Sequence, residues 1–557
     1  MAETPPTPSA EQTTQRSNTL DTGMNKPGDV IINQLLLNTI SSDTPLDLKP
    51  FLMEFHLYED IFSPTLSGSV IIRDSLNLIG KLPIVGDEVL TVDIQTPWGE
   101  LGGYDANNIG KFDPINKIQK SFSVYAIKDR KLNNDREQYY QLFFCSLEAS
   151  TDNVVKLCQK YEGTTDEIAA KIFEDNMQSL RIFTNKQVFE NFSEGAKTEF
   201  FIADTPHESM ITFVAPMWTP IQCLNWLAKR SIGSKFKSPT FMFFETTKAF
   251  YFASIESLVG RQLENNDIYS SFVYNTNLDN LSTVSALTKG FQTVEALQFL
   301  TNLDVIQGQD LGHFASTVHS FDMVKKDYKT YYYDHGFNYK KYTHMEDGTY
   351  DAATGVYSMP APTDTPDNKK PYKMIFPINV LRSSDNKPFV ATVNPGVLDS
   401  TEDSIDLRPE DFIAQRNSAL MDITTLRLQI TVPGRTDAEV GRLIKLFYPS
   451  VGEKTQDSSE AVVWDKFLTG IYMITAIHHQ ITPLRHTMYM EISKDSYAQP
   501  IYDVEETGGT SETPTTETAP ATTPAGTQPT PPPTQPLNSA AEPAPAATPP
   551  PTTTPTA

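Results

Sequence analysis

Apolar and polar residues alternate with a period of two along most of this chain, and this pattern constrains its fold more than any other feature. In the first hundred residues, short runs of this kind are separated by prolines and by Gly68. Two longer runs, Phe122–Ile127 and Tyr140–Ser146, flank a polar loop at Lys128–Glu137 and predict a long hairpin. Residues 29–149 are therefore expected to form an antiparallel β-module.

A similar succession of runs returns far downstream. Val440–Leu446 repeats the glycine-then-strand form of Val85–Leu90, and Ala126-Ile127 and Ala476-Ile477 lie at matching points of two hairpins. These features predict a degenerate internal duplication with its second module at residues 405–500, although two unrelated antiparallel sheets could also match this loosely. The downstream runs are Leu426–Val432, which ends in a Pro433-Gly434 turn, Val440–Leu446, and a hairpin of Gly470–Ile477 and Thr487–Ile492 with His478–Arg485 as its polar loop.

Helical signals appear between the two modules. Thr164–Glu167 is a capping box, and Thr219-Pro220 is typical of a helix start. A hairpin of Phe241–Phe244 and Ala249–Phe252 follows the second helix. The sequence thus predicts an α/β middle domain at 150–290 and a β-rich connecting domain at 291–404. The apolar helix faces are Ile168, Ala169, Ile172 and Phe173 in the first helix and Ile221, Leu224 and Leu227 in the second.

Both ends of the chain are unsuited to a core. Residues 1–28 and 501–557 are predicted to be disordered, because Pro and Thr dominate the C-terminal segment and Leu537 is its only large aliphatic residue after Thr507. The net charge of −24 opposes nucleic acid and anionic membranes at long range. No secretory signal pattern and no run of 18 apolar residues occurs, so we expect a soluble protein made in the cytoplasm.

Enzymatic motifs are incomplete in this sequence. His207 begins an HExxH-like stretch, but Ile211 replaces the second zinc ligand. Glycines near Lys111 and Lys454 lack the spacing of a phosphate-binding loop. A carboxylate pair for glycoside cleavage could still occur among 69 acidic residues, since such a pair is defined in space. We expect no catalytic, cofactor-binding or metal-binding residues. The cysteines Cys145, Cys158 and Cys223 are interpreted as small buried apolar residues, and the hairpin histidines His478, His479 and His486 as surface loop residues, with a metal site as the alternative.

One segment interleaves cations and tyrosines. Lys325–Tyr333 and Tyr339–Tyr342 could form a glycan or nucleic-acid surface. A hairpin with a packed tyrosine face and a solvated lysine face is the simpler interpretation, and a contact to an acidic subunit is a third.

Four regions resemble the central hub proteins of contractile phage-tail baseplates, which are related to the hub portions of type VI secretion spikes and of pyocins. Leu57–Asp74 is similar to an early strand-turn-strand of this family, with a near Phe-Ser-Pro…Gly…Arg-Asp-Ser wording. Trp218–Ile255 resembles its inserted module, and Arg416–Gly441 and Phe467–Ile492 resemble its closing β-domain. The order and spacing of these regions, over most of the folded part, carry the resemblance.

The resemblance implies an α+β, mainly β fold with two tail-tube-like antiparallel β-barrel modules. It implies a non-enzymatic homotrimer in the virion that adapts a sixfold tail tube to a threefold spike and leaves a channel for DNA. The implied partners are a separate trimeric spike protein, tube or tube-initiator proteins and baseplate wedge proteins, without membrane insertion. The runner-up is a β-rich receptor- or glycan-binding tail protein, and a cell-wall hydrolase is third.

Charge adds one expectation for such a channel. A bore that lets DNA slide is better lined by Asp and Glu than by Lys and Arg, because cationic contacts hold the DNA backbone. Lys325, Lys326 and Lys340 are then expected at subunit or spike contacts, away from the bore.

Overall fold

The computed structural model covers the whole chain, and only part of it is described here. The described residues are 26–39, 44–81, 84, 86, 88–96, 117–134, 136–177, 199–204, 211–274, 290–302, 304–322, 327–346, 350–351, 372–378, 409–450 and 464–497.

Strands dominate the described residues. The strands are β1 (Ile31–Asn38), β2 (Leu46–Asp47), β3 (Leu52–Asp60), β4 (Ser67–Asp74), β5 (Val89–Gln95), β6 (Lys117–Asn134), β7 (Glu137–Ser146), β8 (Lys160–Gly163), β9 (Glu199–Ile202), β10 (Ile211–Val214), β11 (Met242–Glu245), β12 (Ala249–Ala253), β13 (Ser270–Tyr274), β14 (Thr293–Val294), β15 (Ala296–Asn302), β16 (Ala315–Asp322), β17 (Asp327–Asp334), β18 (Tyr350–Asp351), β19 (Tyr372–Ile378), β20 (Leu426–Pro433), β21 (Leu443–Phe447), β22 (Gly470–Ile481), β23 (His486–Lys494) and β24 (Ser496–Tyr497). The helices are α1 (Leu78–Lys81), α2 (Leu147–Asp152), α3 (Thr165–Asn176), α5 (Pro220–Ala228), α6 (Ile255–Glu264), α8 (Val305–Leu311), α9 (His335–Asn338) and α10 (Pro409–Thr425), with 3-10 turns at Lys49–Phe51 and Tyr339–Lys341.

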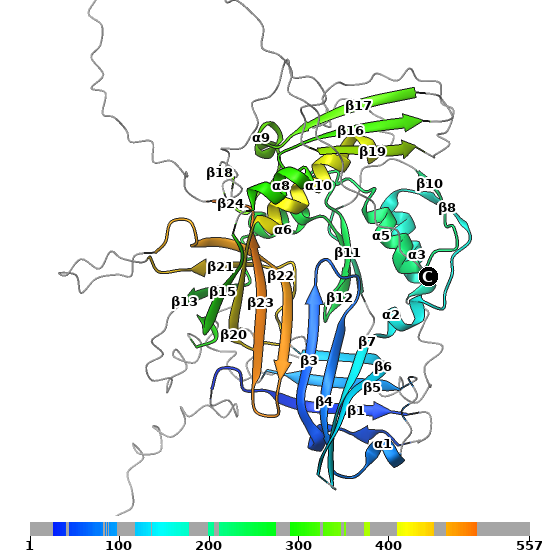
Figure 1. Cartoon of the computed structure of the whole chain (residues 1–557), viewed down its shortest axis with the longest axis vertical. Helices are drawn as coiled ribbons and strands as arrows, with labels where there is room; N and C mark the ends of the chain where they lie inside the picture. Colours follow the sequence, from blue (N-terminus) through cyan, green and yellow to red (C-terminus); the bar gives the residue numbers. More distant parts are fainter. Residues whose placement is uncertain are drawn as a thin grey trace, which may run out of the picture. The chain divides into compact units, whose positions relative to one another are not determined.

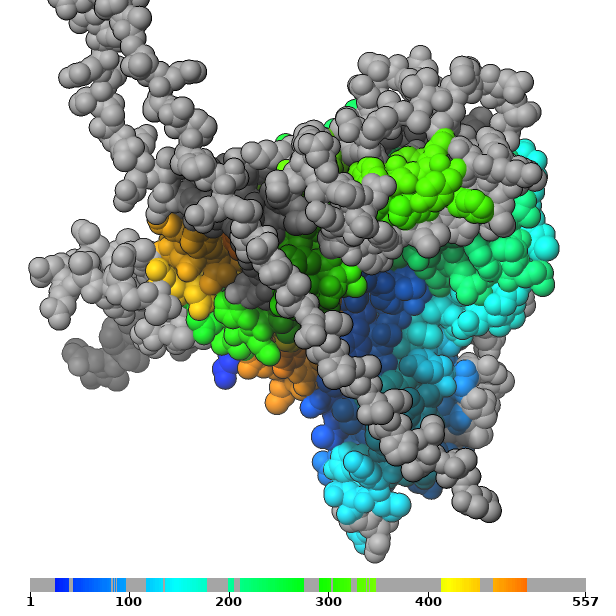
Figure 2. Space-filling model, turned by 45° about the horizontal axis from the view of Figure 1, so that its top comes forward, coloured from blue at the N-terminus to red at the C-terminus, as the bar shows by residue number. Residues whose placement is uncertain are grey.

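A 14-stranded sheet contains two groups of antiparallel strands. The first sheet group has the order β3-β4-β7-β6-β5-β1, and the second has the order β21-β22-β23-β20-β15. Each group packs its own apolar side chains into a core. In Figure 1, β22 and β23 of the second group run beside β3 and β4 of the first, and Figure 2 shows the orange and blue residues in contact. The expectation of a mainly β fold is confirmed.

The second sheet group includes strands from outside residues 405–500. β13 pairs in parallel with β21, and β15 pairs with β20 from Ala296↔Thr431 to Asn302↔Leu426. These strands come from segments assigned above to the middle and connecting domains. The domain boundaries themselves stay predictions.

Both long hairpins extend further than the sequence predicts. β6 continues to Asn134, and β22 continues to Ile481, so the predicted polar loops at Lys128–Glu137 and His478–Arg485 are wrong. Their polar residues belong to strands because backbone pairing continues even where one strand face no longer meets an apolar core.

The two hairpins share an irregularity at the same point. The pairing of β6 with β7 skips Tyr125, between Val124 and Ala126, and the pairing of β22 with β23 skips Thr475, between Ile474 and Ala476. Such a bulge bends a strand and increases its twist.

Backbone hydrogen bonds next to the bulges also correspond. Val124 N donates to Glu88 O at 2.9 Å, and Ile474 N donates to Arg442 O at 2.9 Å. These hydrogen bonds make Glu88 and Arg442 equivalent. Gly86 lies two residues before Glu88 and Gly441 one residue before Arg442, so the two glycines, with φ of 105° and 82°, differ by one position in the comparison of the two hairpins.

The middle part of the chain follows the predicted elements closely. α3 begins after a capping box formed by Thr164 and Glu167, and α5 begins after Thr219 with Pro220 in its first turn. β11 and β12 form the predicted hairpin. The predicted apolar faces of both helices are buried in one core with this hairpin, so the helix and hairpin predictions are confirmed.

A separate sheet of β16, β17 and β19 packs on α10. In β17, Tyr333 is buried beside Val318 and Ala414, whereas Tyr328 and Tyr332 are exposed. The tyrosines therefore divide between the two faces instead of sharing one packed face, because successive strand residues point to opposite sides.

Several predictions fall outside the described residues. They concern both chain ends, His207, the glycines near Lys111 and Lys454, and Lys325 and Lys326. None of the described helices combines the length and apolar character needed to cross a bilayer.

Candidate functional site

The two sheet groups meet through strand β22. Its first residues, 470–473, pair with β21, and its later residues, 476–481, pair with β3 of the first group. The bulged residue Thr475 lies between these two parts, and its carbonyl accepts a hydrogen bond from Ile61 N at 3.0 Å. The register of the junction is Ala476↔Asp60, Ile477↔Glu59, His478↔Tyr58, His479↔Leu57, Gln480↔His56 and Ile481↔Phe55.

Histidines and a glutamate fill the junction. The side chains of Glu59 and His479 are fully buried, with His479 Nε2 3.5 Å from Glu59 Oε1. His479 Nδ1 lies 3.0 Å from Nε2 of His486, and burial holds the pKa of His486 well below its usual value. Burial, together with the neighbouring His56, lowers the pKa of His478 to about 4. The interpretation of His478, His479 and His486 as surface loop residues is therefore wrong, because β22 and β23 extend over them.

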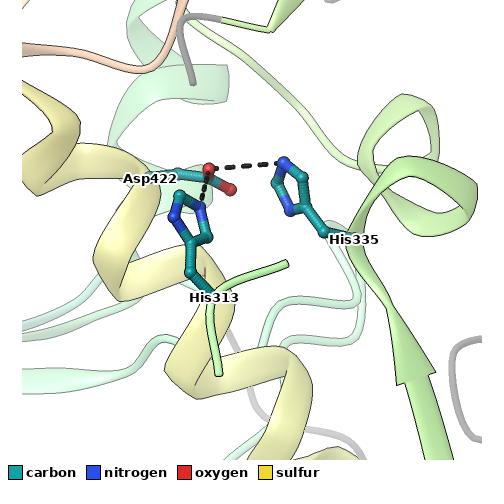
Figure 3. A group of neighbouring side chains, drawn as sticks. All are labelled: His313, His335 and Asp422. Atoms are coloured by element: carbon teal, nitrogen blue, oxygen red, sulfur yellow. Dashed lines mark hydrogen bonds and ion pairs between the residues drawn. The ribbon is translucent and has the colours of Figure 1, made fainter. Parts of the chain in front are cut away.

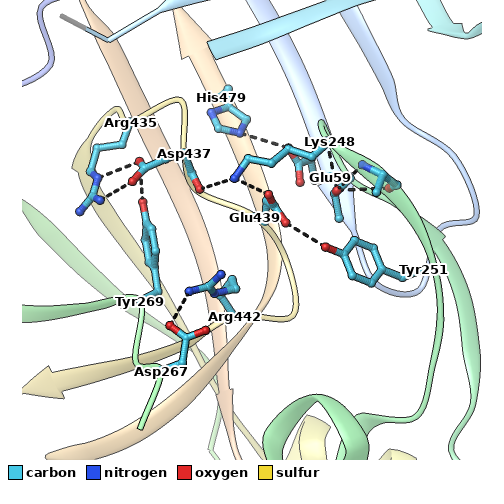
Figure 4. Close-up of polar contacts among 12 residues, drawn as sticks. Glu59, Lys248, Tyr251, Asp267, Tyr269, Arg435, Asp437, Glu439, Arg442 and His479 are labelled. Carbon is cyan, nitrogen blue, oxygen red and sulfur yellow. Dashed lines mark hydrogen bonds and ion pairs between the residues drawn. The ribbon is translucent and has the colours of Figure 1, made fainter. Parts of the chain in front are cut away.

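The β11–β12 hairpin binds both sheet groups at this junction. On the first group, Glu245 accepts a hydrogen bond from Leu66 N at 2.9 Å and forms an ion pair with the buried Lys120. On the second group, Lys248 Nζ lies 2.5 Å from Glu439 Oε1, and Tyr251 donates to Glu439 at 3.3 Å (Figure 4).

The segment between β20 and β21 is fixed by a buried ion pair. Arg435 binds Asp437 through Nε at 2.9 Å and Nη2 at 2.5 Å, and the Tyr269 hydroxyl donates to Asp437 at 3.0 Å (Figure 4). Burial raises the pKa of Asp437, but the charge of Arg435 outweighs this and keeps the pKa below its usual value. Thr96 and Thr436 exchange backbone-to-hydroxyl hydrogen bonds of 3.1 Å each, which adds a second link between the groups.

One edge of β6 and one edge of β15 pair with no other described strand. β5 pairs with β6 as far as Ser123, and Val124 N donates to Glu88 O, so the same edge of residues 125–134 is open within the described part of the chain. β15 pairs with β20 on one side, and no described strand lies on its other side. Large apolar side chains are exposed on these strands: Tyr125 at 55%, Leu132 at 75%, Phe299 at 43% and Leu300 at 41%.

The cysteines give no sign of a reactive thiol. Cys145 and Cys223 are half-buried and buried, and burial raises the pKa of each thiol to about 11. A thiol with a raised pKa is a poor nucleophile near neutral pH. Cys158 is exposed, so its interpretation as a buried apolar residue is wrong. The wider expectation of no catalytic, cofactor or metal residues stays a prediction.

Comparison with known proteins gives weak likenesses to tail proteins. No family model matches the sequence, and no curated protein matches it. A tail protein from Neisseria meningitidis MC58 aligns with 10% identity and a TM-score of 0.43, over 83% of this chain and 96% of that chain. The 43 kDa tail protein of prophage MuSo2 from Shewanella oneidensis aligns with 9% identity and a TM-score of 0.43, over 83% and 98%.

An Escherichia coli component of the type VI secretion system aligns with 8% identity and a TM-score of 0.36, over 83% of this chain and 77% of that chain. TM-scores at this level do not establish a shared fold.

Sequence patterns located the hairpins of this junction but missed its polar interior. Glu59 and His479 lie 420 residues apart in the chain, so no local spacing connects them. The only available signal is that each occupies a core-facing position in its alternating run, where a charged residue requires a partner.

Proposed function

We propose that this chain is a structural subunit that closes into a ring by strand pairing between copies, as the central hub of a phage-tail baseplate. One observation carries the proposal: the β22–β3 junction joins two similar strand groups within one chain, and the equivalent edges of β6 and β15 pair with no other strand among the described residues. A heterologous contact repeated around an axis forms a ring when its rotation closes.

The strand registers define which elements correspond. β6 and β22 are equivalent strands, because each has a bulge at the same point of its hairpin. The strand order on either side of them is also the same, so the other equivalent pairs are β5 and β21, β7 and β23, β4 and β20, and β3 and β15. In β22, the residues beyond the bulge pair with β3. The equivalent contact pairs β6 beyond its bulge with β15, and the partner β15 belongs to the next copy.

The proposed pairing between copies would also bury apolar residues that are exposed on β15. Gly68 in β4 and Leu428 in β20 occupy equivalent positions in the two sheet groups. Leu57 pairs with Gly68 and Phe299 pairs with Leu428, so Phe299 is the equivalent of Leu57. Leu57 is fully buried at the junction, whereas Phe299 is exposed. A second copy laid against β15 would bury Phe299 and Leu300 in the same way. Open, apolar strand edges otherwise favour uncontrolled aggregation.

Three copies with two strand groups each present six similar groups around one axis. This arrangement suits a homotrimer between a sixfold tail tube and a threefold spike, which is the role implied by the sequence resemblance. We propose as partners a trimeric spike protein, tube or tube-initiator proteins and wedge proteins, with DNA passing through an acidic bore in the virion.

The experiment is a mass measurement on the purified full chain and on the double variant Phe299→Glu/Leu300→Lys. Light scattering after size exclusion should give three chains for the wild type, and negative-stain images should show a ring with a central hole. The double variant should be a folded monomer.

Val154→Glu is the matched control, because Val154 is an exposed apolar residue outside the two sheet groups. This variant should remain a trimer. A wild-type monomer at the highest soluble concentration, or a double variant that still forms trimers, would contradict the proposal.

A glycan-binding tail protein is the second candidate, and the exposed rings of Tyr328 and Tyr332 on β17 favour it. Aromatic rings are common platforms for sugars, and Tyr328 is held by a 2.6 Å hydrogen bond to His319. A glycan array distinguishes the two functions. Specific binding that is lost in Tyr328→Ala/Tyr332→Ala supports a receptor role, whereas an empty array removes this candidate.

A further inference from the structure

Three side chains from separate elements converge beside helix α10. His313 follows α8, His335 begins α9, and Asp422 lies in α10 (Figure 3). One ligand atom of each lies within 4.8 Å of the other two. The side chains are nearly buried, with exposures of 5%, 3% and 11% respectively. None of the candidate metal-binding or catalytic motifs considered in the sequence includes them.

Both imidazoles direct the same nitrogen at the same carboxylate oxygen. His313 Nε2 lies 2.7 Å from Asp422 Oδ1, and His335 Nε2 lies 3.5 Å from that atom (Figure 3). The two rings meet edge to face with centroids 4.9 Å apart. Two protonated imidazoles at this separation would repel each other strongly in a buried environment.

Ser418 fixes the protonation of one ring. Its hydroxyl donates to the carbonyl of His313 at 2.8 Å, and a serine has only one such proton. The 3.1 Å contact between Ser418 Oγ and His335 Nδ1 therefore has the histidine as donor. A neutral His335 with its proton on Nδ1 directs the lone pair of Nε2 towards the carboxylate. Such a lone pair and a carboxylate oxygen can share one bound cation, whereas without a cation a second proton on Nε2 would bridge them.

His344 is a buried histidine in the same chain whose two ring nitrogens are both satisfied as hydrogen-bond donors. Its Nδ1 lies 3.0 Å from Asp495 Oδ2, and its Nε2 lies 2.7 Å from the carbonyl of Tyr339. Both nitrogens face acceptors. Burial lowers the pKa of His344, but the hydrogen bond to Asp495 outweighs this and raises the pKa to about 9. The cluster around Asp422 differs, since two rings converge on one carboxylate oxygen instead of one.

We propose that His313, His335 and Asp422 bind one divalent transition-metal ion of the zinc type. Two imidazole nitrogens and one carboxylate oxygen are a ligand set that Zn²⁺ accepts, with water in a fourth position. The hydrogen bond from His335 to Ser418 is the kind of outer contact that orients a metal-binding histidine. This proposal departs from the expectation above that the chain holds no metal, and it is independent of the proposed ring.

The bound ion has a structural role. α10 leads directly into β20 of the second sheet group, while His335 follows β17 of the separate sheet. A metal held by all three residues would fasten the β16–β17 hairpin to the helix that enters the large sheet. Its removal should loosen that attachment and leave the β22–β3 junction intact.

The test uses the purified full chain after dialysis against a chelator has removed any bound metal. Zn²⁺ titrated into the chain should bind at one ion per chain by calorimetry and elemental analysis, and it should raise the thermal transition temperature. His335→Gln should lose this stoichiometric site. His344→Gln, which removes another buried imidazole beside a carboxylate, should keep it.

Co²⁺ provides a readout on the unmodified chain, so that the test does not depend on the folding of a variant. Visible d–d absorption should appear as one equivalent of Co²⁺ binds, and Zn²⁺ should displace it. A chain with no stoichiometric metal and a transition temperature unchanged by chelator and Zn²⁺ would overturn the proposal. Equal Zn²⁺ binding by folded His335→Gln would overturn it as well.

Discussion

Single residues in the first sheet group are constrained by backbone proximity. Gly68 was expected to separate two strands, but it lies inside β4 and pairs with both Leu57 and Phe144. A Cβ atom at this position would lie 2.3 Å from the carbonyl of His56 and 2.3 Å from the ring of Phe144. The sequence cannot distinguish a glycine that ends a strand from one that admits a neighbouring ring, because both appear as a break in the pattern.

Gly68→Ala should therefore destabilise the chain by about 1–3 kcal/mol, the usual cost of overpacking. Urea unfolding at equilibrium measures the change. Ser67→Ala, at an exposed position of the same strand, should change the free energy of unfolding by less than about 0.5 kcal/mol. Equal effects for the two variants would show that the close approach does not constrain β4.

Buried histidines give the stability a pH dependence with two limbs. The folded pKa values of His478 and His486 lie below the unfolded value, so their contribution is present above about pH 6.5 and is lost as pH falls. The folded pKa of His344 is raised to about 9, so its contribution is present below about pH 6.5 and is lost as pH rises through 9.

The free energy of unfolding is thus expected to fall on both sides of about pH 6.5. Urea unfolding across pH 4.5–9.5 measures both limbs. His478→Gln should make the acid limb shallower, with the remaining slope due to His486, and His344→Gln should flatten the alkaline limb. Gln480→Leu, a change at a residue of β22 that does not titrate, should keep both slopes, and a flat profile in the wild type would refute this assignment.

Local elements were largely predictable, because caps and alternation are properties of neighbouring residues. The starts of α3 and α5 and the β11–β12 hairpin follow from Thr164, Thr219-Pro220 and two aromatic runs. The strand ends of β6 and β22 were not predictable, since the polar residues there pair with partners that alternation alone does not reveal. The role of the β11–β12 turn as a link between sheet groups was also hidden, because its contacts lie more than 100 residues away.

The buried pair of Lys120 and Glu245 tests this link. Glu245→Gln leaves the lysine charge buried without its partner and should destabilise the chain by about 3–5 kcal/mol. The double variant Lys120→Met/Glu245→Gln, which removes both charges and keeps an amide oxygen as the acceptor for Leu66 N, should recover most of that loss. Glu264→Gln breaks an exposed ion pair with Lys235 and should cost less than about 1 kcal/mol in the same urea titration. Similar losses for both single variants would mean that the hairpin contributes little.

At the scale of the whole molecule, sequence reasoning recognised two similar strand groups but not how they connect. The match of Ala126 with Ala476 is reproduced by the two bulges. The inclusion of β13 and β15 in the second group was missed, because more than 100 residues separate β15 from its partner β20. The β22–β3 pairing was missed for the same reason. The candidate metal cluster was missed because His313 and His335 lie at the two ends of the β16–β17 hairpin and Asp422 lies in the distant helix α10.

The C-terminal segment provides a further prediction at this scale, argued from composition alone. Deleting residues 507–557 should leave the thermal transition of the remaining chain almost unchanged, because a segment so poor in apolar residues offers little to bury. Differential scanning calorimetry of the full and shortened chains measures this. A drop of many degrees would show that the segment is packed.

The most direct test of the proposed ring is a cross-link between β6 and β15. Lys128 is the equivalent of His478, and Thr301 is the equivalent of Tyr58, by the strand registers. Because His478 pairs with Tyr58 within the chain, Lys128 of one copy is predicted to face Thr301 of the next. The measurement uses Lys128→Cys/Thr301→Cys with the exposed Cys158 changed to alanine. Oxidation should convert this chain into a covalent closed trimer on a denaturing gel, while each version that carries only one of the two introduced cysteines forms no closed trimer. A folded double variant that remains a single chain after oxidation would contradict ring closure through these two strands.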